Sequence, residues 1–472
     1  MTTTINVKLI NQSTVAPLPQ AKQAANICYQ AEIPPLEEVS NKTISFVKGR
    51  LFEVGHHTTL QHSYFTFVID GISISDITFG LHLTSPFYNS DQRSGRYCGK
   101  MFTDPDYQTI ENYLTSNWPE ETGDSQKLAK IMTFVKKGFE IYKTHIEQAS
   151  TVAGQLLTAE RPNLSTDAIA QKQQKIAQEQ LRMFIPIIFP TALDFTINLS
   201  ALVSLWESAW TPGMREVTEK MKLEVLNLYP ELSFMFTENR RRKTDWGCKL
   251  QSNEVKLVFE PAINSITVTT EGMIIPESEL IGPLDKLHFT PELMDNNIAQ
   301  LNIFSAQMSI ATMGQDQRHR TIRRGLPTFT GAFYVPPIIQ ELINDESSLL
   351  TQEVVENYFN EWLELAKELS SSLLMSIAPY GAVVSYNKGC TINALIHEQA
   401  KRLCWCAQEE IYNLSRLLRQ LIEEKYPNNQ QLLRVFEPPC MMTGRCMEGP
   451  GYCGRNISLL LPIKEFFPQR RV

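Results

Sequence analysis

Residues 315–320 of the sequence, Gln-Asp-Gln-Arg-His-Arg, concentrate positive charge in a chain whose formal net charge is −7. Planar guanidinium groups such as those of Arg318 and Arg320 suit phosphates and electron-rich rings. A charge run is commonly a solvated surface, but this one follows an apolar stretch, residues 304–313. We therefore treat Arg318, His319 and Arg320 as a candidate segment for binding an anion or a ring system.

A second polar segment, residues 89–97, contains Ser94, Gly95 and Arg96 in sequence. The hydroxyl can donate a hydrogen bond, the glycine lets a backbone approach closely, and the arginine offers a two-pronged donor. Together these groups could cradle an anion. An ordinary polar loop is the simpler interpretation of this segment taken by itself.

Three histidines, His56, His57 and His62, lie close together beside a strand-like segment. A zinc site could use such residues, but neither a fourth ligand nor a Cys-x-x-Cys companion lies near them in the sequence. We expect a structural or solvated role on composition alone.

The cysteines are nine in number, an odd count without a secretory context, which favours reduced thiols. Cys440, Cys446 and Cys453 could join a zinc site only if the tail folds back to Cys404 or Cys406. We expect free thiols in a packed tail, and no metal.

The elements that must position these residues are helices and strands in alternation. Apolar periodicity predicts helices over residues 126–148, 167–183, 349–374 and 391–425, and strands over 64–69 and 333–335. Two short segments recur in the sequence and suggest a tandem duplication. Val-Lys-Leu-Ile at residues 7–10 resembles Val-Lys-Leu-Val at 255–258, and Tyr-Pro occurs at 229–230 and again at 426–427. We expect an α+β fold with a boundary around residues 240–250. A single irregular chain with accidental echoes is the alternative.

Composition excludes several classes of protein. The acidic balance argues against general nucleic-acid binding. No run approaches 18 apolar residues, and the N-terminus has no signal-like segment, so we expect no membrane association and a cytoplasmic location. The Gly-x-Gly-x-x-Gly string at 449–454 follows no strand and does not predict a dinucleotide site.

Taken together, the polar segments resemble motifs of the flavin-dependent thymidylate synthases, the ThyX family. The hallmark of that family is R-H-R-x-x-S-x-N-E-x-S-x-R-Y, preceded by H-x-[TS]-x-x-x-H-x-x-F-x-F. In this chain the hallmark is divided. The first half carries the preceding segment, from His56 to residue 67, and the end of the hallmark at residues 94–97, whereas the second half carries residues 318–320, with Gln315 three positions earlier.

The helical motifs of the family are divided in the same way. Its E-x-x-R-x-x-x-P stands in the first half as Glu179, Arg182 and Pro186, followed by Asn198 at the expected offset. Its R-x-x-x-x-A-Q-x-E-I ending is approximated in the second half by residues 402–411. The resemblance therefore implies complementary loss of motifs, with each active site composed of both halves.

The resemblance implies two tandem ThyX-like domains, residues 1–240 and 250–438, followed by a cysteine-bearing tail, 439–472. Each domain would be a β-sheet with long packed helices. The chain would dimerise into a pseudo-tetramer, since members of the family are homotetramers that share sites between subunits.

The activity that the resemblance implies is the reductive methylation of dUMP to dTMP by an FAD-dependent thymidylate synthase, with NADPH and methylenetetrahydrofolate as co-substrates. It implies three sets of site residues. The catalytic set is Arg402, Arg182 and His56; the cofactor-binding set is Arg318, His319, Arg320, Thr58, Asn198 and His397; the substrate-binding set is Gln315, Gln92, Ser94, Gly95, Arg96, Arg182 and Arg402.

Two departures from the family pattern leave alternatives open. Gln92 stands where the family has a glutamate, and Arg323 where it has a serine. The chain could instead be a flavoprotein that modifies another pyrimidine nucleotide, or a ThyX-derived protein that binds a nucleotide without catalysis.

Overall fold

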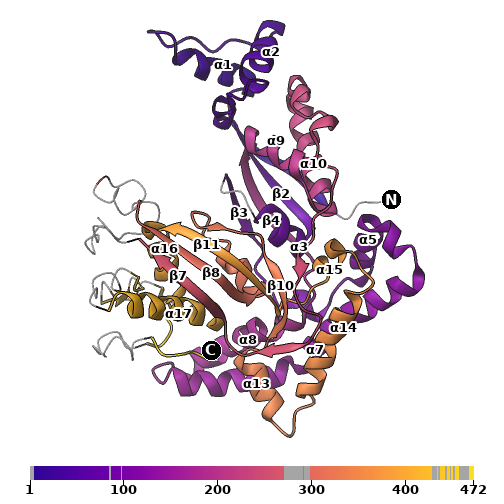
Figure 1. Ribbon diagram of the computed structural model, residues 1–472, viewed down its shortest axis with the longest axis vertical. Helices are drawn as coiled ribbons and strands as arrows, with labels where there is room; N and C mark the ends of the chain where they lie inside the picture. The colour runs from indigo at the N-terminus through magenta and orange to yellow at the C-terminus, as the bar shows by residue number, and fades with distance from the viewer. Residues whose placement is uncertain are drawn as a thin grey trace. The chain divides into compact units, whose positions relative to one another are not determined.

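A computed structural model describes residues 5–83, 87–96, 98–269, 291, 298–427, 433, 436–438, 440–441, 444–446, 448–449, 452–455 and 467–472. The fold is α+β, as predicted (Figure 1). By packing, the chain forms two compact units that are not simple sequence halves. Unit 1 comprises Met1–Ser94, Asp106–Ala129 and Ile187–Gly247; unit 2 comprises Gly95–Pro105, Lys130–Pro186 and Cys248–Val472.

Unit 1 is built on an antiparallel sheet with the strand order β1-β2-β4-β3. Its strands are β1 (Asn6–Gln12), β2 (Tyr64–Ser73), β3 (Tyr88–Gln92) and β4 (Pro190–Asn198). Phe65, Phe67 and Ile69 of β2 are buried, whereas Tyr64 is exposed, which is the alternation of a half-buried strand. This confirms the strand predicted over residues 64–69.

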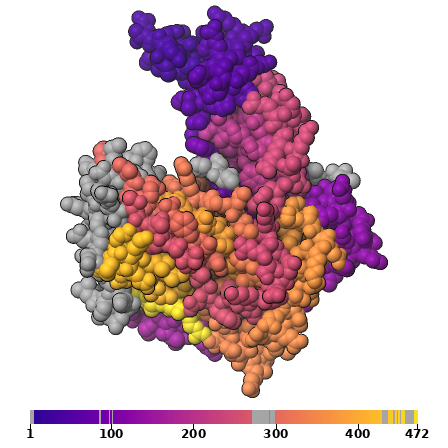
Figure 2. Space-filling model, viewed as in Figure 1, coloured from indigo at the N-terminus to yellow at the C-terminus, as the bar shows by residue number. Residues whose placement is uncertain are grey.

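The helices of unit 1 include α9 and α10, which follow β4 in the chain (Figure 1). The bounds are α1 (Pro17–Ile27), α2 (Asn41–Val47), α3 (Ile74–Asp76), α5 (Tyr107–Asn117), α6 (Pro119–Thr122), α9 (Leu199–Ser208) and α10 (Pro212–Leu228). Figure 2 shows the N-terminal segment with α1 and α2, in indigo, at the surface of this unit. Between these two helices Tyr29 and Ile33 are exposed.

Unit 2 contains a larger sheet with the order β5-β10-β11-β8-β7. Its strands are β5 (Lys249–Leu250), β7 (Ala262–Val268), β8 (Gln300–Ser309), β10 (Thr328–Tyr334) and β11 (Ala382–Thr391), with β6 (Lys256–Val258) beside β10 and β9 (Arg323–Arg324) beside β11. Strand β10 extends the strand predicted over residues 333–335.

The helices of unit 2 come from both sequence halves. Those of the first half are α4 (Lys100–Thr103), α7 (Ser125–Glu160, except for its first turn) and α8 (Thr166–Leu181). Those of the second half are α12 (Ile310–Asp316), α13 (Pro337–Asn344), α14 (Gln352–Leu365), α15 (Ser371–Ser376), α16 (Ile392–Arg402) and α17 (Glu409–Lys425). The halves meet where Pro186 and Pro379 form an antiparallel bridge.

Two predicted helices are each interrupted. The segment 349–374 divides into α14 and α15, and the segment 391–425 divides into α16 and α17 with a turn at residues 403–408. Leu403 and Ala407 are buried within that turn, so the apolar periodicity continues through residues where the helix is interrupted. The prediction of one continuous helix over residues 391–425 was therefore wrong.

The two sheets share a strand order and a register. The order β1-β2-β4-β3 matches β7-β8-β11-β10, and all of these pairs are antiparallel. Tyr64 pairs with Asn198 as Gln300 pairs with Thr391. In each sheet the last residue of the third strand, Asn198 or Thr391, caps the helix that follows.

Candidate functional site

The Arg-His-Arg segment follows α12, whose first turn is held by a buried carboxylate on α17. Glu410 accepts hydrogen bonds from the backbone N–H of Ser309, at 2.6 Å, and from Oγ1 of Thr312, at 2.7 Å. Because the first N–H groups of a helix lack partners within it, a carboxylate there satisfies them and interacts favourably with the helix dipole. Glu410 thus positions the helix that ends immediately before residues 318–320.

A buried network of charges holds the same segment at its other end. Lys388 Nζ donates to Asp316 Oδ1 at 2.5 Å and to Glu398 Oε1 at 2.8 Å. Arg324 pairs with Asp316 and also donates to the carbonyl oxygens of His319, at 3.1 Å, and Ile322, at 2.8 Å. Burial alone would raise the pKa of Asp316, but Arg324 and Lys388 hold it well below its usual range.

Arg402, at the end of α16, contacts two predicted site residues directly. Its Nε donates to Nε2 of His319 at 2.9 Å, and its Nη2 donates to the carbonyl oxygen of Gln315 at 2.7 Å. Burial, reinforced by the charge of Arg402, lowers the pKa of His319 well below its usual range. Burial also lowers the pKa of Arg402 to about 10, so at neutral pH a neutral imidazole faces a cationic guanidinium.

Arg96 and Gly95 lie in unit 2 beside α8. Arg96 Nε donates to Glu179 Oε1 at 2.7 Å, and its Nη2 donates to the carbonyl oxygen of Cys406 at 3.1 Å. A Cβ placed on Gly95 would lie 3.4 Å from Nη1 of Arg182, so glycine permits a close approach of the backbone to that guanidinium. Arg96 and Arg182 are therefore neighbours through Glu179 and Gly95.

Gln408 joins the two sequence halves within unit 2. Its Oε1 accepts from Nη2 of Arg182, at 2.8 Å, and from Nε2 of Gln315, at 2.7 Å. Arg182 is only 5% exposed, and its guanidinium carbon lies 5.2 Å from the centre of the Tyr380 ring. The structure thus brings together Arg96, Arg182, Gln315, His319 and Arg402, all predicted site residues.

Sequence reasoning missed Gln408 and Tyr380 as site residues. Gln408 lies in the A-Q-x-E-I ending, so its presence in that motif was an available signal. Tyr380 follows Pro379 directly, and nothing in its local sequence marks it.

Three buried polar atoms of this network have no hydrogen-bond partner among the described residues. They are Nε of Arg182, Oε1 of Gln315 and Nε2 of Gln408. Buried polar groups are almost always paired, because an unpaired one carries its full desolvation cost of about 1–3 kcal/mol. The three atoms offer a donor, an acceptor and a donor in one network, which is a pattern that a bound molecule could complete.

The remaining predicted residues are distributed between the units. In unit 2, Arg318 is exposed, whereas Arg320 and His397 are half-buried. In unit 1, His56 and Thr58 are exposed at the start of the 3₁₀ helix His57–His62. Gln92 ends β3, and Ser94 follows two residues later.

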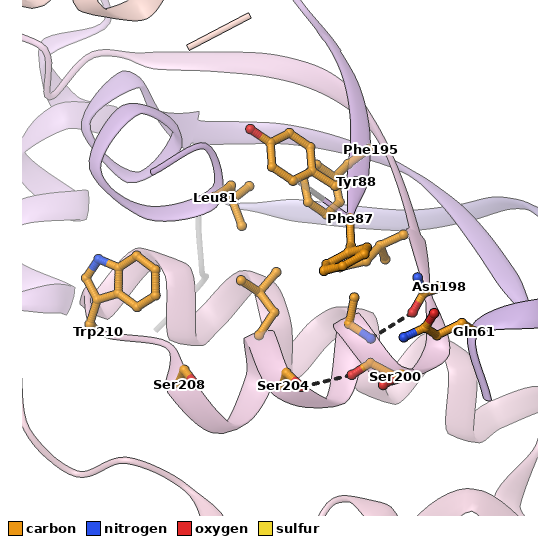
Figure 3. A pocket seen from close by; sticks show the side chains of 13 residues that line it. Gln61, Leu81, Phe87, Tyr88, Phe195, Asn198, Ser200, Ser204, Ser208 and Trp210 are labelled. Atoms are coloured by element: carbon orange, nitrogen blue, oxygen red, sulfur yellow. Dashed lines mark hydrogen bonds between the residues drawn. The ribbon is translucent and has the colours of Figure 1, made fainter. Parts of the chain in front are cut away.

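Asn198, also in unit 1, is buried and has a structural role. Its Oδ1 accepts from the backbone N–H of Ala201 at 2.8 Å, which caps α9. It also lines a cavity of about 250 Å³ (Figure 3). Phe87, Tyr88 and Phe195 lie together on one side of this cavity, serines at every fourth position of α9 lie along the other, and Trp210 lies beside Ser208.

Among the described residues, no three His, Cys, Asp or Glu side chains are grouped so that they could hold a metal ion, and none of the cysteines forms a disulfide. Of the helices described, none is both long and apolar enough to cross a membrane.

Comparisons with known proteins find one family model that matches the N-terminal part of the chain. Residues 8–231 match the family model Thy1, described as thymidylate synthase complementing protein. No curated protein matches the chain. Among solved structures, a UMP/dUMP methylase PolB from Streptomyces cacaoi, bound with 5-Br dUMP, is similar at 17% identity and a TM-score of 0.34, over 50% of this chain and 97% of that one.

A second similar structure is Thymidylate Synthase X (ThyX) from Helicobacter pylori with FAD and dUMP. It has 16% identity and a TM-score of 0.33, over 50% of this chain and 98% of that one. The segment 8–231, just under half of the chain, is therefore similar in sequence to the Thy1 family.

Proposed function

We propose that the chain is a flavin-dependent thymidylate synthase that methylates dUMP to dTMP in the cytoplasm. Methylenetetrahydrofolate would supply the one-carbon unit, and NADPH would reduce bound FAD. The active site would be composite, with Arg96 and Arg182 from the first sequence half and Gln315, His319 and Arg402 from the second. Arg402 contacts His319 and Gln315 directly, Gln408 links Arg182 to Gln315, and Arg96 binds Glu179 and the carbonyl oxygen of Cys406; these contacts within unit 2 support such a site.

The observation that carries the proposal is the donor–acceptor–donor set of unpaired atoms on Arg182, Gln315 and Gln408. A uracil ring presents the complementary edge, because its 2-oxo and 4-oxo groups accept hydrogen bonds and its N3–H between them donates one. A cytosine ring keeps the 2-oxo acceptor but presents an acceptor at N3 and an amino donor at C4, so it would match only one of the three atoms. The network therefore favours a 2,4-dioxopyrimidine.

Arg96 is the group in this network best suited to the phosphate of the nucleotide. Its guanidinium is half-buried, and its ion pair with Glu179 fixes its orientation, while the resemblance assigns this arginine to the substrate and guanidinium groups suit phosphates. The neighbouring Gly95 leaves room for a close approach.

The residues around Arg318 fit an anionic, aromatic cofactor such as FAD. The segment supplies the charge of Arg318 and the neutral imidazole of His319, and His397 lies on α16 of the same unit. The flavin, when bound, would supply the hydride. The protein would hold the ring and neutralise negative charge on it, which is electrostatic stabilisation by fixed groups. His56, Thr58 and Asn198 of unit 1, together with Gln92 and Ser94, complete the proposed set by resemblance.

We further propose that the chain is a tandem duplication that dimerises into a pseudo-tetramer. The shared strand order, the shared register and the equivalent caps at Asn198 and Thr391 support duplication. The domains would be residues 1–240 and 250–438, with the tail at 439–472. Each copy would have lost the motif that the other retains.

The test begins with the absorbance spectrum of the purified protein, which should show bound flavin. NADPH-dependent conversion of dUMP to dTMP should follow, measured by mass spectrometry of the nucleotide. Arg96→Ala and Arg320→Ala should each abolish it, although they lie in different sequence halves. Full activity of either variant would contradict the composite site.

A second candidate is a flavoprotein that acts on another pyrimidine nucleotide, which Gln92 and Arg323 favour because they replace the glutamate and the serine of the family. Parallel assays with dUMP and UMP distinguish the two by the mass of the product. A colourless preparation that binds dUMP would instead favour a nucleotide-binding protein without catalysis.

A further inference from the structure

The turn between α16 and α17 links two residues of the proposed nucleotide site, Arg402 and Gln408. A hydrogen bond from the backbone N–H of Ala407 to the carbonyl oxygen of Cys404, at 2.9 Å, closes it. Such a turn brings residues two positions apart to a separation that a disulfide can span. Cys404 and Cys406 occupy these two positions.

Arginine side chains hold the carbonyl groups of this turn. Arg161 Nη2 donates to the oxygen of Trp405 at 3.2 Å, Arg96 Nη2 to that of Cys406 at 3.1 Å, and Arg470 Nη1 to that of Ala407 at 3.3 Å. The conformation of the turn is therefore coupled to Arg96, a residue of the proposed site.

The two thiols of the turn are hydrogen-bonded to each other and are half-buried. The hydrogen bond from Cys406 lowers the pKa of the Cys404 thiol, and that same bond, with burial, raises the pKa of Cys406. By contrast, burial raises the pKa of Cys390 to about 12 and that of Cys440 to about 11. A pair with one stabilised thiolate and one adjacent thiol has the features of a reactive dithiol.

We propose that Cys404 and Cys406 form a dithiol–disulfide site that small disulfides such as oxidised glutathione oxidise. The Cys404 thiolate attacks one sulfur of glutathione disulfide, which forms a mixed disulfide and releases one glutathione thiolate. Cys406 then loses its proton to solvent and attacks the Cys404 sulfur, which expels the second glutathione. Two protein thiols are oxidised, and one glutathione disulfide is reduced to two thiols.

Oxidation would weaken nucleotide binding, a consequence that rests on the proposed function. A ring closed through Cys404 and Cys406 changes the backbone at the carbonyl that Arg96 binds, and it displaces Gln408 from Arg182 and Gln315. The loss of one charge-assisted hydrogen bond corresponds to about tenfold weaker binding of dUMP.

The chemistry can be tested without any activity assay, by peptide mapping of the full chain. Trypsin cleaves after Arg402 and Arg416, so residues 403–416 form one peptide that contains both thiols and no other cysteine. After treatment with oxidised glutathione and alkylation, this peptide should be lighter by two hydrogens and unalkylated, and dithiothreitol should reverse both changes. Cys440→Ser, a matched control in the tail, should behave like the wild type.

Exposed Cys28 reports whether the oxidant has reacted, because its thiol should form a mixed disulfide. The proposal is overturned if Cys28 is modified while both thiols of the peptide remain free. It is equally overturned if Cys404 becomes linked to a tail peptide instead of to Cys406.

Titration of dUMP into reduced and oxidised protein tests the consequence. The oxidised wild type should bind about tenfold more weakly, and Cys404→Ser should bind equally well before and after oxidation. Equal binding by both forms of the wild type would refute the coupling. If the reduced protein binds no dUMP, the proposed function fails while the disulfide result stands.

Discussion

Replacing Arg182 by methionine separates a binding role from a structural one. Arg182 is buried, donates one hydrogen bond to Gln408 and lies over the ring of Tyr380. Its Nε has no partner among the described residues, so part of its desolvation cost is not offset. A residue placed for stability alone would not leave a buried donor unpaired.

The magnitudes for Arg182→Met differ for folding and for binding. Gln408 Oε1 keeps its hydrogen bond from Gln315, and Glu179 keeps its ion pair with Arg96, so no buried group loses its last partner. The free energy of unfolding should therefore change by only about 1 kcal/mol. Binding of dUMP should weaken by about 3 kcal/mol, roughly a hundredfold, because a nucleotide oxygen would lose a charged donor.

Thermal unfolding and calorimetric titration of dUMP measure the two effects in the same preparations. Arg324→Met is the matched control, since it also removes a buried arginine of unit 2. That change takes an ion pair from Asp316 and a donor from the carbonyls of His319 and Ile322, so it should destabilise the fold by about 3–5 kcal/mol. The reasoning is refuted if Arg182→Met binds dUMP like the wild type, or if it unfolds as readily as Arg324→Met.

Further predictions concern protonation, charge and space. Burial raises the pKa of Glu409 to about 8 in the folded protein. Ionising this carboxyl therefore destabilises the fold; the effect is absent below the pKa of the unfolded state, near 4.5, and grows as the pH rises to 8. The melting temperature of Glu409→Gln should therefore exceed that of the wild type by more at pH 8 than at pH 5, and a constant difference would contradict this. Lys388→Met leaves Glu398 without this buried cation and should lower the melting temperature, whereas Lys367→Met, which removes an exposed pair, should not. A Cβ at Gly213 would overlap Asp76, so Gly213→Ala should destabilise unit 1 in urea unfolding; an unchanged midpoint would show that the helix can shift.

Several side chains of the candidate site could be picked out from the sequence, because polar and charged residues stand there in family-like spacing. Arg182 and Arg402 stand far apart in the sequence, yet the divided motifs predicted that they share a site. The structure joins them through Gln408 and Gln315. That link depends on the side-chain amide of Gln408, and its role is visible only from its contacts in the structure.

The interruption of the helix at residues 403–408 could not be predicted from periodicity. Leu403 and Ala407 keep the apolar spacing, and no proline or glycine marks the turn. Its stability comes from distant arginines, Arg96, Arg161 and Arg470, which satisfy the carbonyl groups that a helix would have used. Contacts between residues so remote in sequence leave no local pattern.

The packing units likewise depend on contacts that no linear boundary expresses. One change from unit 1 to unit 2 occurs after Gly247. Yet residues 95–105 and 130–186 of the first half pack in unit 2. In that unit Phe134 stacks on Tyr358, and the Tyr358 hydroxyl donates to the carbonyl oxygen of Phe184 at 2.6 Å.

Each unit buries a carboxylate beside the residue that caps the helix after β2 or after β8, which are Ser73 and Ser309. The two carboxylates come from different elements. In unit 2, Glu410, the second residue of α17, accepts from Ser309 and Thr312. In unit 1 the acceptor is Asp76, which Ser73 and Thr211 contact.

Asp76 stands three positions after the cap Ser73, where unit 2 has Thr312 after Ser309. Gly213 is the second residue of α10, where unit 2 has Glu410 on α17. A side chain at Gly213 would collide with Asp76, so one carboxylate excludes the other. Under the proposed duplication, the buried carboxylate has moved from one element to another and has not been lost, because each copy keeps one. Only the copy with Glu410 also keeps Gln408 two residues earlier, and Gln408 is the residue that joins Arg182 to Gln315.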